Sequence, residues 1–274
     1  MRDLPDVLHR LSVALPPVLA GLLVFRFFGA PNSYLLVNAG AFILGTVALM
    51  FVRAPTGGKA VHWIASAALA LMAAPLVMGH ELDGIRRWIA LGPVALNTGL
   101  VAVPVLAVVC ARGGPVGVLT FACATLILTL QPDAAALLAL SLAGLTMAAV
   151  GKDWRFGLIG LLCLVGAVVR HTNGVPDPVP FVEGVVHMVW SRSLLSGLAL
   201  LVALAVPVAA LWRGSLLDRR AAIVLAASYA GFCLASLTND YPLPLTGYGA
   251  SAIIGFLLAL ALVPARSKST EQRL

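Results

Sequence analysis

The chain has 274 residues, of which 61% are hydrophobic and only 11% are charged, and its mean hydropathy is +1.01. A soluble domain carries about 25% charged residues, so this composition excludes the soluble globular class and predicts a polytopic membrane protein. The net charge of +7 does not indicate a nucleic-acid partner, because membrane proteins collect Lys and Arg in cytoplasmic loops. The four cysteines lie inside apolar runs without metal-ligand spacing, so neither a disulfide nor a metal site is expected.

Ten apolar segments follow one another along the chain, each close to the length of a membrane-spanning helix. Pro132 separates the fifth from the sixth, because proline disfavours helix in the residue before it. The predicted helices span residues 11–29, 33–52, 60–79, 94–111, 116–131, 133–150, 156–170, 193–212, 221–238 and 249–264. The predicted fold is therefore an all-α transmembrane domain at 1–265, followed by a short cytoplasmic tail at 266–274.

An even number of crossings puts both termini on one side, and the basic residues indicate which side that is. With both termini inside, 13 of the 18 Lys and Arg fall in inner segments and four in outer loops. This asymmetry follows the positive-inside rule, so we expect both termini to be cytoplasmic. The four outer residues are Arg86, Arg87, Arg170 and Arg192. Three outer loops, within 80–93, 171–192 and 239–249, then share one face, where a site would be assembled.

The first of these outer loops contains two adjacent arginines in the stretch HELDGIRRWIALGP, at residues 80–93. One interpretation is an interfacial helix that lies on the membrane with its charges among the lipid headgroups. The other is an anion site, since the guanidinium groups of Arg86 and Arg87 can bind a phosphate or pyrophosphate bidentately. Arginines on the outer face run against the positive-inside trend, which favours the anion site.

Two carboxylates and one irregular segment are further candidates. Asp133 begins the sixth helix, either as a simple contact with the helix dipole or as a site carboxylate. Glu183 and His187 would share a helix face, and Glu183 is either a general base or a solvated loop carboxylate. The stretch NDYPLPLTGYGASAI, at 239–253, is either a plain loop or a re-entrant segment. Irregular backbone at membrane depth must be buried in protein or line a wet cavity.

Together these motifs resemble the SEDS family of membrane proteins, which includes FtsW, RodA and SpoVE. Residues 84–93 are similar to the family's G-x-R-R-W-I-x-L-G-P, and residues 131–133 to its Q-P-D. Residues 242–251, PLPLTGYGAS, are similar to its P-L-P-F-x-S-Y-G-G-S. The motifs occur in family order, and the ten-helix topology also agrees. The resemblance spans residues 84 to 251 and implies a short, divergent member of the family.

The resemblance implies a membrane glycosyltransferase of the peptidoglycan-polymerase type at the outer face of the bacterial inner membrane. Members polymerise lipid II, a polyprenyl-pyrophosphate-linked sugar, in cell-wall synthesis, cell shape and division. They usually work beside a class B penicillin-binding protein, among membrane lipids. The family's catalytic Asp aligns with Glu183 when LLSG at 194–197 is used as the anchor. The implied substrate-binding residues are Arg86, Arg87, Trp88, Asp133, Tyr248 and Ser251.

The role of Asp133 is left open by the motifs: it would either hold an arginine or bind a divalent cation on the pyrophosphate.

The sequence departs from the family at several positions. The family's buried Glu and Lys are replaced by Leu100 and Val103, and its acidic pair by Ser191-Arg192. These departures support a second hypothesis, a catalytically inactive relative that binds a lipid-linked precursor or a cell-wall partner as a regulator or scaffold. A third is a transporter of a lipid-linked precursor, whose expected mark is charge at mid-membrane; Arg26 is the one clear candidate.

Overall fold

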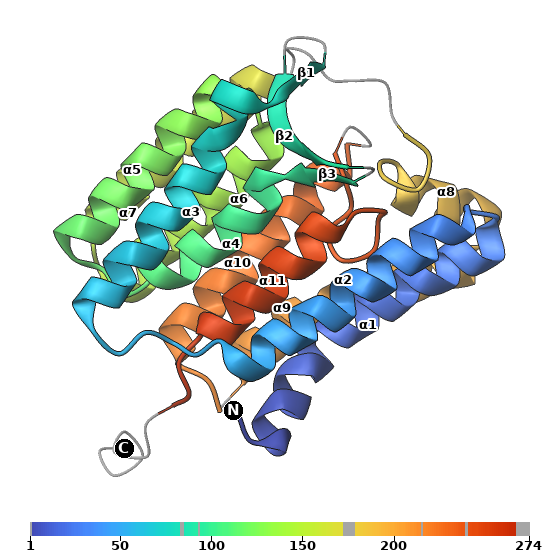
Figure 1. The fold of residues 1–274 in the computed structure, drawn as a ribbon, viewed down its shortest axis with the longest axis horizontal. Helices are drawn as coiled ribbons and strands as arrows, with labels where there is room; N and C mark the ends of the chain where they lie inside the picture. The colour runs from blue at the N-terminus through green and yellow to red at the C-terminus, as the bar shows by residue number, and fades with distance from the viewer. Residues whose placement is uncertain are drawn as a thin grey trace.

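The computed structural model describes residues 2–82, 85–92, 94–171, 179–214, 216–238 and 241–266. These residues form eleven helices and three strands (Figure 1). Ten of the helices overlap the ten predicted segments, but residues 94–97, predicted as helix, form a strand. The ten are α1 (Leu4–Phe28), α2 (Asn32–Phe51), α3 (Gly58–Met78), α4 (Thr98–Cys110), α5 (Gly114–Leu130), α6 (Ala134–Gly151), α7 (Trp154–His171), α9 (Leu194–Arg213), α10 (Arg219–Ser236) and α11 (Ala250–Leu262). The eleventh, α8 (Val185–Arg192), is a short helix in an outer loop. The predicted ten-helix fold is confirmed.

The helices have the properties of a multi-pass membrane protein. Within the described residues, α1, α2, α3, α6 and α9 are long and apolar enough to cross a membrane, and α4, α5 and α11 are shorter apolar helices. Large apolar side chains are exposed along the outward faces of α1, α7 and α9. Such exposure would be unfavourable in water, whereas in a bilayer these side chains contact lipid of the same polarity.

The core of the bundle is built around α4. All of its residues are buried, and it packs against α3, α5, α6, α10 and α11. A helix that is apolar all round is stable only when it is enclosed on every side. On α11, Gly255 permits the closest approach, because a Cβ atom there would lie 2.3 Å from the carbonyl oxygen of Leu100.

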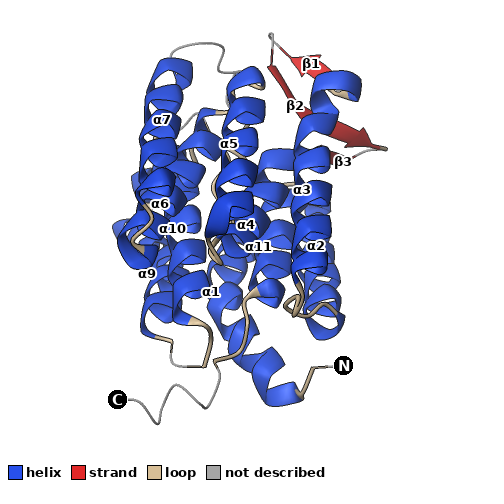
Figure 2. Cartoon of the chain, turned by 90° about the vertical axis from the view of Figure 1, so that its left-hand side faces the viewer, coloured by secondary structure: helices blue, strands red, loops and turns tan. Residues whose placement is uncertain are grey.

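Both central helices are shorter than a membrane is thick. α4 and α11 have 13 residues each, which gives a length of about 20 Å, roughly 10 Å less than the hydrocarbon core. Their inner ends reach the same end of the bundle as the first residues of the chain, and the missing length lies at the outer end (Figure 2). A small sheet and the segment 241–249 occupy that space.

The sheet is antiparallel, in the order β1-β2-β3, with β1 (His80–Leu82), β2 (Ile85–Leu91) and β3 (Val94–Asn97). It contains the arginine-rich stretch, so the interfacial-helix interpretation of that stretch is wrong. The burial of successive side chains alternates, as it does in a strand: Ile85 and Arg87 are buried, and Arg86 between them is exposed. Successive side chains of a strand point to opposite faces, so the pattern buries one arginine and exposes the other.

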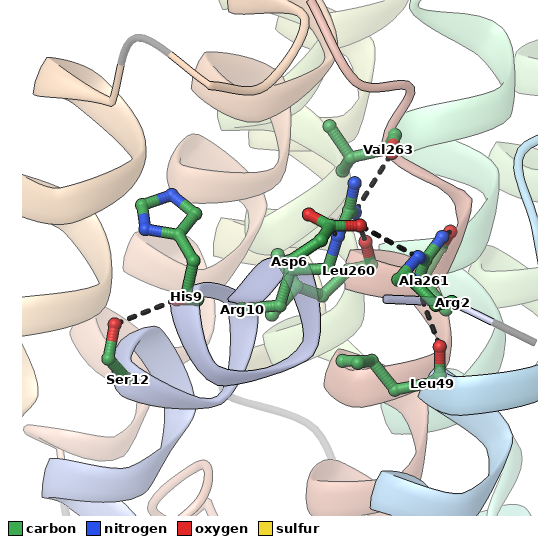
Figure 3. Close-up of polar contacts among 9 residues, drawn as sticks. All are labelled: Arg2, Asp6, His9, Arg10, Ser12, Leu49, Leu260, Ala261 and Val263. Carbon is green, nitrogen blue, oxygen red and sulfur yellow. Dashed lines mark hydrogen bonds and ion pairs between the residues drawn. The ribbon is translucent and has the colours of Figure 1, made fainter. Parts of the chain in front are cut away.

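At the inner end, three charged residues near the N-terminus form a cluster, here called the inner-end cluster: Arg2, Asp6 and Arg10. Figure 1 shows the first turns of α1 at an angle to the rest of the helix, which contains Pro16 and Pro17. Figure 3 shows Asp6 between the two arginines, and the Nε atom of each lies 2.9 Å from its carboxylate.

The arginines of the inner-end cluster also donate to the ends of α2 and α11. The accepting carbonyl oxygens, at 2.6 to 2.9 Å, belong to Leu49, Leu260, Ala261 and Val263. The last carbonyl groups of a helix lack intrahelical partners and attract cations. The cluster therefore ties α1, α2 and α11 together where each reaches the inner surface.

Replacing Arg10, which is 1% exposed, should destabilise this end of the bundle. In Arg10→Met, Asp6 loses one of its partners and two carbonyl groups lose their donor, so we expect unfolding to require about 3 kcal/mol less free energy. Thermal unfolding of the purified protein in detergent measures the change. Arg26→Met is the control, because Arg26 is an exposed arginine on the same helix. Equal effects of the two substitutions would contradict the role of the cluster.

Candidate functional site

A cavity of about 490 Å³, here called the outer cavity, lies at the outer end of the bundle. It is enclosed by α2, β2, β3, the segment 179–183, the segment 242–249 and the first turns of α4 and α11. Four residues predicted from the sequence line it: Trp88, Glu183, Tyr248 and Ser251. The structure therefore brings together side chains from all three outer loops.

The floor of the outer cavity is formed where α4 and α11 begin. The side chain of Asn97 accepts a hydrogen bond from the backbone N–H of Leu100 at 3.0 Å, which caps α4. The backbone N–H of Asn97 donates to the hydroxyl of Ser251 at 2.9 Å, so the two helix starts are joined. α11 has no side-chain cap at Gly249. Helix N-termini carry partial positive charge and uncommitted N–H groups, so this floor favours an anionic ligand.

One wall of the cavity is held in place by Asn38 on α2. Its side-chain amide donates to the carbonyl oxygen of Gly247 and accepts from the N–H of Gly249, both at 3.0 Å. Gly249 has φ 146°, a conformation that residues with a Cβ atom rarely adopt. Because Asn38 is buried, these two bonds are not exchanged with water. The amide therefore fixes the backbone on both sides of Tyr248.

Aromatic rings support the same wall from behind. Tyr34 on α2 stacks on Tyr248, with ring centroids 3.7 Å apart and planes 11° apart. Phe25 on α1 and Phe181 meet Tyr34 edge to face, at 6.0 and 6.4 Å. Edge and stacked arrangements are the favourable geometries of aromatic pairs. The cluster links α1 and α2 to the two outer segments that line the cavity.

The segment that contains Glu183 is bonded to this wall through its backbone. The N–H of Tyr248 donates to Phe181 at 2.7 Å, and the N–H of Leu243 donates to Val182 at 3.2 Å. The Glu183 carboxylate accepts a hydrogen bond from the N–H of Val179 at 2.9 Å. Glu183 is thus a half-buried carboxylate held at the edge of the cavity, a geometry that suits a base acting on a bound hydroxyl group.

Arg87 and Asp133 form a buried pair behind the cavity. The guanidinium Nη1 lies 4.0 Å from the Asp133 carboxylate, and each side chain is 3% exposed. The same carboxylate oxygen accepts the N–H of Ala136 at 3.0 Å, so Asp133 also caps α6. Gly99 makes room for it, because a Cβ atom at residue 99 would lie 2.9 Å from the other carboxylate oxygen.

Aromatic rings flank the guanidinium group of Arg87, which lies 4.4 Å from the ring centre of Trp88 and 5.5 Å from that of Tyr241. Its Nε atom has no hydrogen-bond partner among the described residues. A void of about 10 Å³ adjoins the pair and shares Asn97 and Leu100 with the lining of the outer cavity. A void of this size holds about one water molecule. Arg87 is therefore close to the cavity without being exposed in it.

The structure separates the two arginines that the sequence suggested would act together. Arg86 is exposed on the opposite face of β2 from Arg87 and is not among the residues that line either cavity. The described residues include no group of three or more His, Cys, Asp or Glu placed to hold a metal ion. Leu100 lines both the outer cavity and the small void that adjoins Arg87, and it leaves this part of the floor apolar.

Three residues of the site were not predicted: Asn38, Asn97 and Tyr34. Asn97 stands directly before an apolar run, which is the usual signal of an N-cap. Asn38 is a polar residue in the middle of a predicted membrane span, and such residues usually have a specific partner. Tyr34 carried no signal, because its role depends on a ring that is more than 200 residues away in the sequence.

A bundle of apolar helices with a one-sided cavity and a buried Arg–Asp pair behind it defines a polytopic membrane protein with a site at the outer surface. No protein-family model and no curated protein matches the chain. Solved structures do match.

A point mutant of the rod shape determining protein RodA of Thermus thermophilus is similar over 92% of this chain and 94% of that chain, with 22% identity and a TM-score of 0.70. The structure of unmutated RodA from the same organism is 21% identical over 95% of this chain and 94% of that chain, with a TM-score of 0.65. A third structure is described as a peptidoglycan synthase complex that coordinates polymerization and crosslinking. Its matching chain is 22% identical over 95% of this chain and 96% of that chain, with a TM-score of 0.62. The fold implied by the SEDS resemblance is confirmed.

Removing the Asn38 amide should loosen the cavity wall. In Asn38→Ala both bonds to the segment 247–249 are lost, and we expect amide hydrogen exchange there to be about tenfold faster. Exchange measured by mass spectrometry reports on peptides that cover this segment. Asn32→Ala, at the exposed start of the same helix, should leave the exchange rate unchanged. Unchanged protection in Asn38→Ala would show that the wall is held in another way.

The Arg87–Asp133 pair can be tested by a double-mutant cycle. We expect Arg87→Met and Asp133→Asn each to lower the free energy of unfolding by about 3 kcal/mol, because each leaves a buried charge without its partner. The double variant should lose at least about 1 kcal/mol less than the sum of the two. Arg86→Met is the control on the same strand and should cost less than about 1 kcal/mol. Strict additivity would argue against a direct interaction.

Proposed function

We propose that the chain is a membrane glycosyltransferase of the peptidoglycan-polymerase type. It would act on a polyprenyl-pyrophosphate-linked sugar of the lipid II kind at the outer face of the bacterial inner membrane. The observation that carries the proposal is the position of Glu183, a carboxylate on the rim of a cavity whose floor is made by two helix N-termini. A base and an anion-binding surface thus face the same space.

In this mechanism Glu183 removes the proton from a hydroxyl group of the acceptor sugar. The resulting oxygen attacks the anomeric carbon of the donor from the side opposite to the pyrophosphate. The new C–O bond forms as the bond from the anomeric carbon to the pyrophosphate oxygen breaks, and the configuration at that carbon inverts. Trp88 and Tyr248, which line the cavity, supply flat apolar surfaces for the sugar rings.

The departing pyrophosphate gains negative charge, and stabilising that charge is usually the largest electrostatic contribution to such a reaction. The N-terminal ends of α4 and α11, with Ser251 between them, provide N–H groups and partial positive charge. The guanidinium group of Arg87 adds the positive end of an ion pair behind the wall, and Asp133 keeps it in position. Of the two roles considered for Asp133, holding an arginine fits this geometry. Arg86, on the exposed face of β2, would meet the headgroup as it enters.

The lipid tail of the substrate also has a suitable surface. A cavity of about 260 Å³ lies between α3, α4 and α11, and the residues that line it are apolar, including Ile64, Leu71, Val105 and Leu258. Val52, at the end of α2, also lines this cavity. A prenyl chain lying there would keep its hydrocarbon in the membrane while its pyrophosphate reaches the outer cavity.

A crosslinking partner follows from the same proposal. One similar structure belongs to a peptidoglycan synthase complex that coordinates polymerization and crosslinking. By analogy, this chain would work beside a class B penicillin-binding protein that crosslinks the new strands.

A second candidate function is supported by the apolar floor at Leu100. The chain would then bind a lipid-linked precursor or a cell-wall partner without catalysing transfer, as a regulator or scaffold. Binding of labelled lipid II without polymer formation, in the presence of a partner, distinguishes this function from the first.

Glu183→Gln should abolish polymer formation and leave the fold intact, because glutamine keeps the size of the side chain but cannot accept the proton. Purified protein is incubated with lipid II, with and without a transpeptidase partner, and glycan strands are separated on a gel. We expect a loss of at least about 100-fold. Asp3→Asn, an exposed carboxylate at the inner end, is the control. A Glu183→Gln protein as active as the wild type would remove Glu183 from the mechanism.

A further inference from the structure

A second cavity lies at the inner end of the bundle, opposite to the outer cavity and separate from every residue used above. It has a volume of about 170 Å³ and is here called the inner cleft. Its walls are the first two turns of α3 and of α5, and its base is the last turn of α4. The inner cleft thus lies at the level of the cytoplasmic surface of the membrane.

The electrostatics of the inner cleft favour an anion. Both α3 and α5 begin with glycine and have no side-chain cap, so the positive ends of their dipoles are left uncovered. Arg112 and His62 line the cleft and are exposed. The guanidinium group of Arg220 lies behind it, 3.2 Å from the position that a Cβ atom of Gly113 would take. None of the described residues that line the cleft is acidic.

Thr120 provides an independent indication that something binds there. It lines the cleft, is only 7% exposed, and makes no hydrogen bond with any residue that the structure describes. Thr46, Thr125 and Thr129 each donate to the carbonyl oxygen four residues earlier, whereas the Thr98 hydroxyl at the start of α4 also lacks a partner among the described residues. The Thr120 oxygen is not among the fully enclosed polar atoms that lack a partner, so it faces the space of the cleft. The Thr120 hydroxyl is therefore available to a ligand.

The apolar part of the cleft defines the class of ligand. Val61, Ala65 and Val116 line it, and Trp63 and Leu119 are exposed beside it, at 76% and 65%. Tryptophan at a helix end is typical of the membrane interface. The cleft therefore combines a cationic mouth with walls that continue into the lipid-facing surface.

We propose that the inner cleft is a binding site for an anionic phospholipid of the inner leaflet. The phosphate would lie at the starts of α3 and α5 against Arg112 and His62, and the glycerol backbone would reach Thr120. One acyl chain would follow the groove between the two helices. Basic pockets between transmembrane helices on the cytoplasmic side are suited to such headgroups. A soluble anion would make no use of the apolar walls.

The experiment measures lipid-dependent thermal stabilisation of the purified protein in detergent. Phosphatidylglycerol is titrated against the unfolding midpoint, with phosphatidylcholine as the neutral lipid and inorganic phosphate as the soluble anion. We expect stabilisation by phosphatidylglycerol alone. Its apparent affinity should fall about fivefold in Arg112→Gln and about fivefold in Thr120→Val, which loses a hydrogen bond to the glycerol backbone.

Arg213→Gln is the matched control, because it removes one exposed charge at the inner end on a helix that does not form the cleft. It should bind phosphatidylglycerol like the wild type. Arg112 also donates to the carbonyl oxygen of Pro55, so Thr120→Val tests the site independently if Arg112→Gln fails to fold. Equal weakening by Arg213→Gln, an unaltered affinity in Thr120→Val, or saturation by inorganic phosphate would each overturn the proposal. None of these results depends on polymerase activity.

Discussion

Two central helices, α4 and α11, are too short to cross the membrane, and the outer half of the structure depends on this constraint. With 13 residues each, they end at the inner surface and begin about 10 Å below the outer one. The gap cannot be left to lipid, because irregular backbone at that depth needs internal partners. The sheet and the segment 241–249 fill it, and the outer cavity is the space that remains between them.

The polar groups of this region are satisfied largely by single residues that serve two elements at once. Asn97 caps α4 and bonds to the start of α11, Asn38 bonds on both sides of Tyr248, and Asp133 caps α6 while facing Arg87. Each of these residues supplies partners to backbone groups that lack them, at a helix start or in the irregular segment 247–249. These amides and carboxylates hold the walls of the cavity in place, as the proposed reaction would require in order to orient two large substrates.

The sequence was sufficient for the helices and for the face on which the site lies, and insufficient for the geometry within it. Apolar runs located ten helices, and Gln131-Pro132-Asp133 correctly separated two of them. Around Arg86 and Arg87 the local pattern indicates either an interfacial helix or an anion site and does not predict a strand, because the strand depends on pairing with β1 and β3. Asn38 bonds to Gly247 and Tyr34 stacks on Tyr248, each more than 200 residues away, a distance over which local pattern carries no information.

The layer of apolar side chains around α4 determines where the membrane voltage falls. α4 contains no Asp, Glu, Lys, Arg or His, and every one of its residues is buried, so the layer between the outer cavity and the cytoplasm is an insulator about 20 Å thick. Because the cavity lies on the outer side of this layer, most of the membrane voltage falls below it rather than across it. A charge that moves within the cavity therefore crosses almost none of that voltage. Chemistry on a pyrophosphate there would proceed at nearly the same rate in an energised and in a depolarised cell.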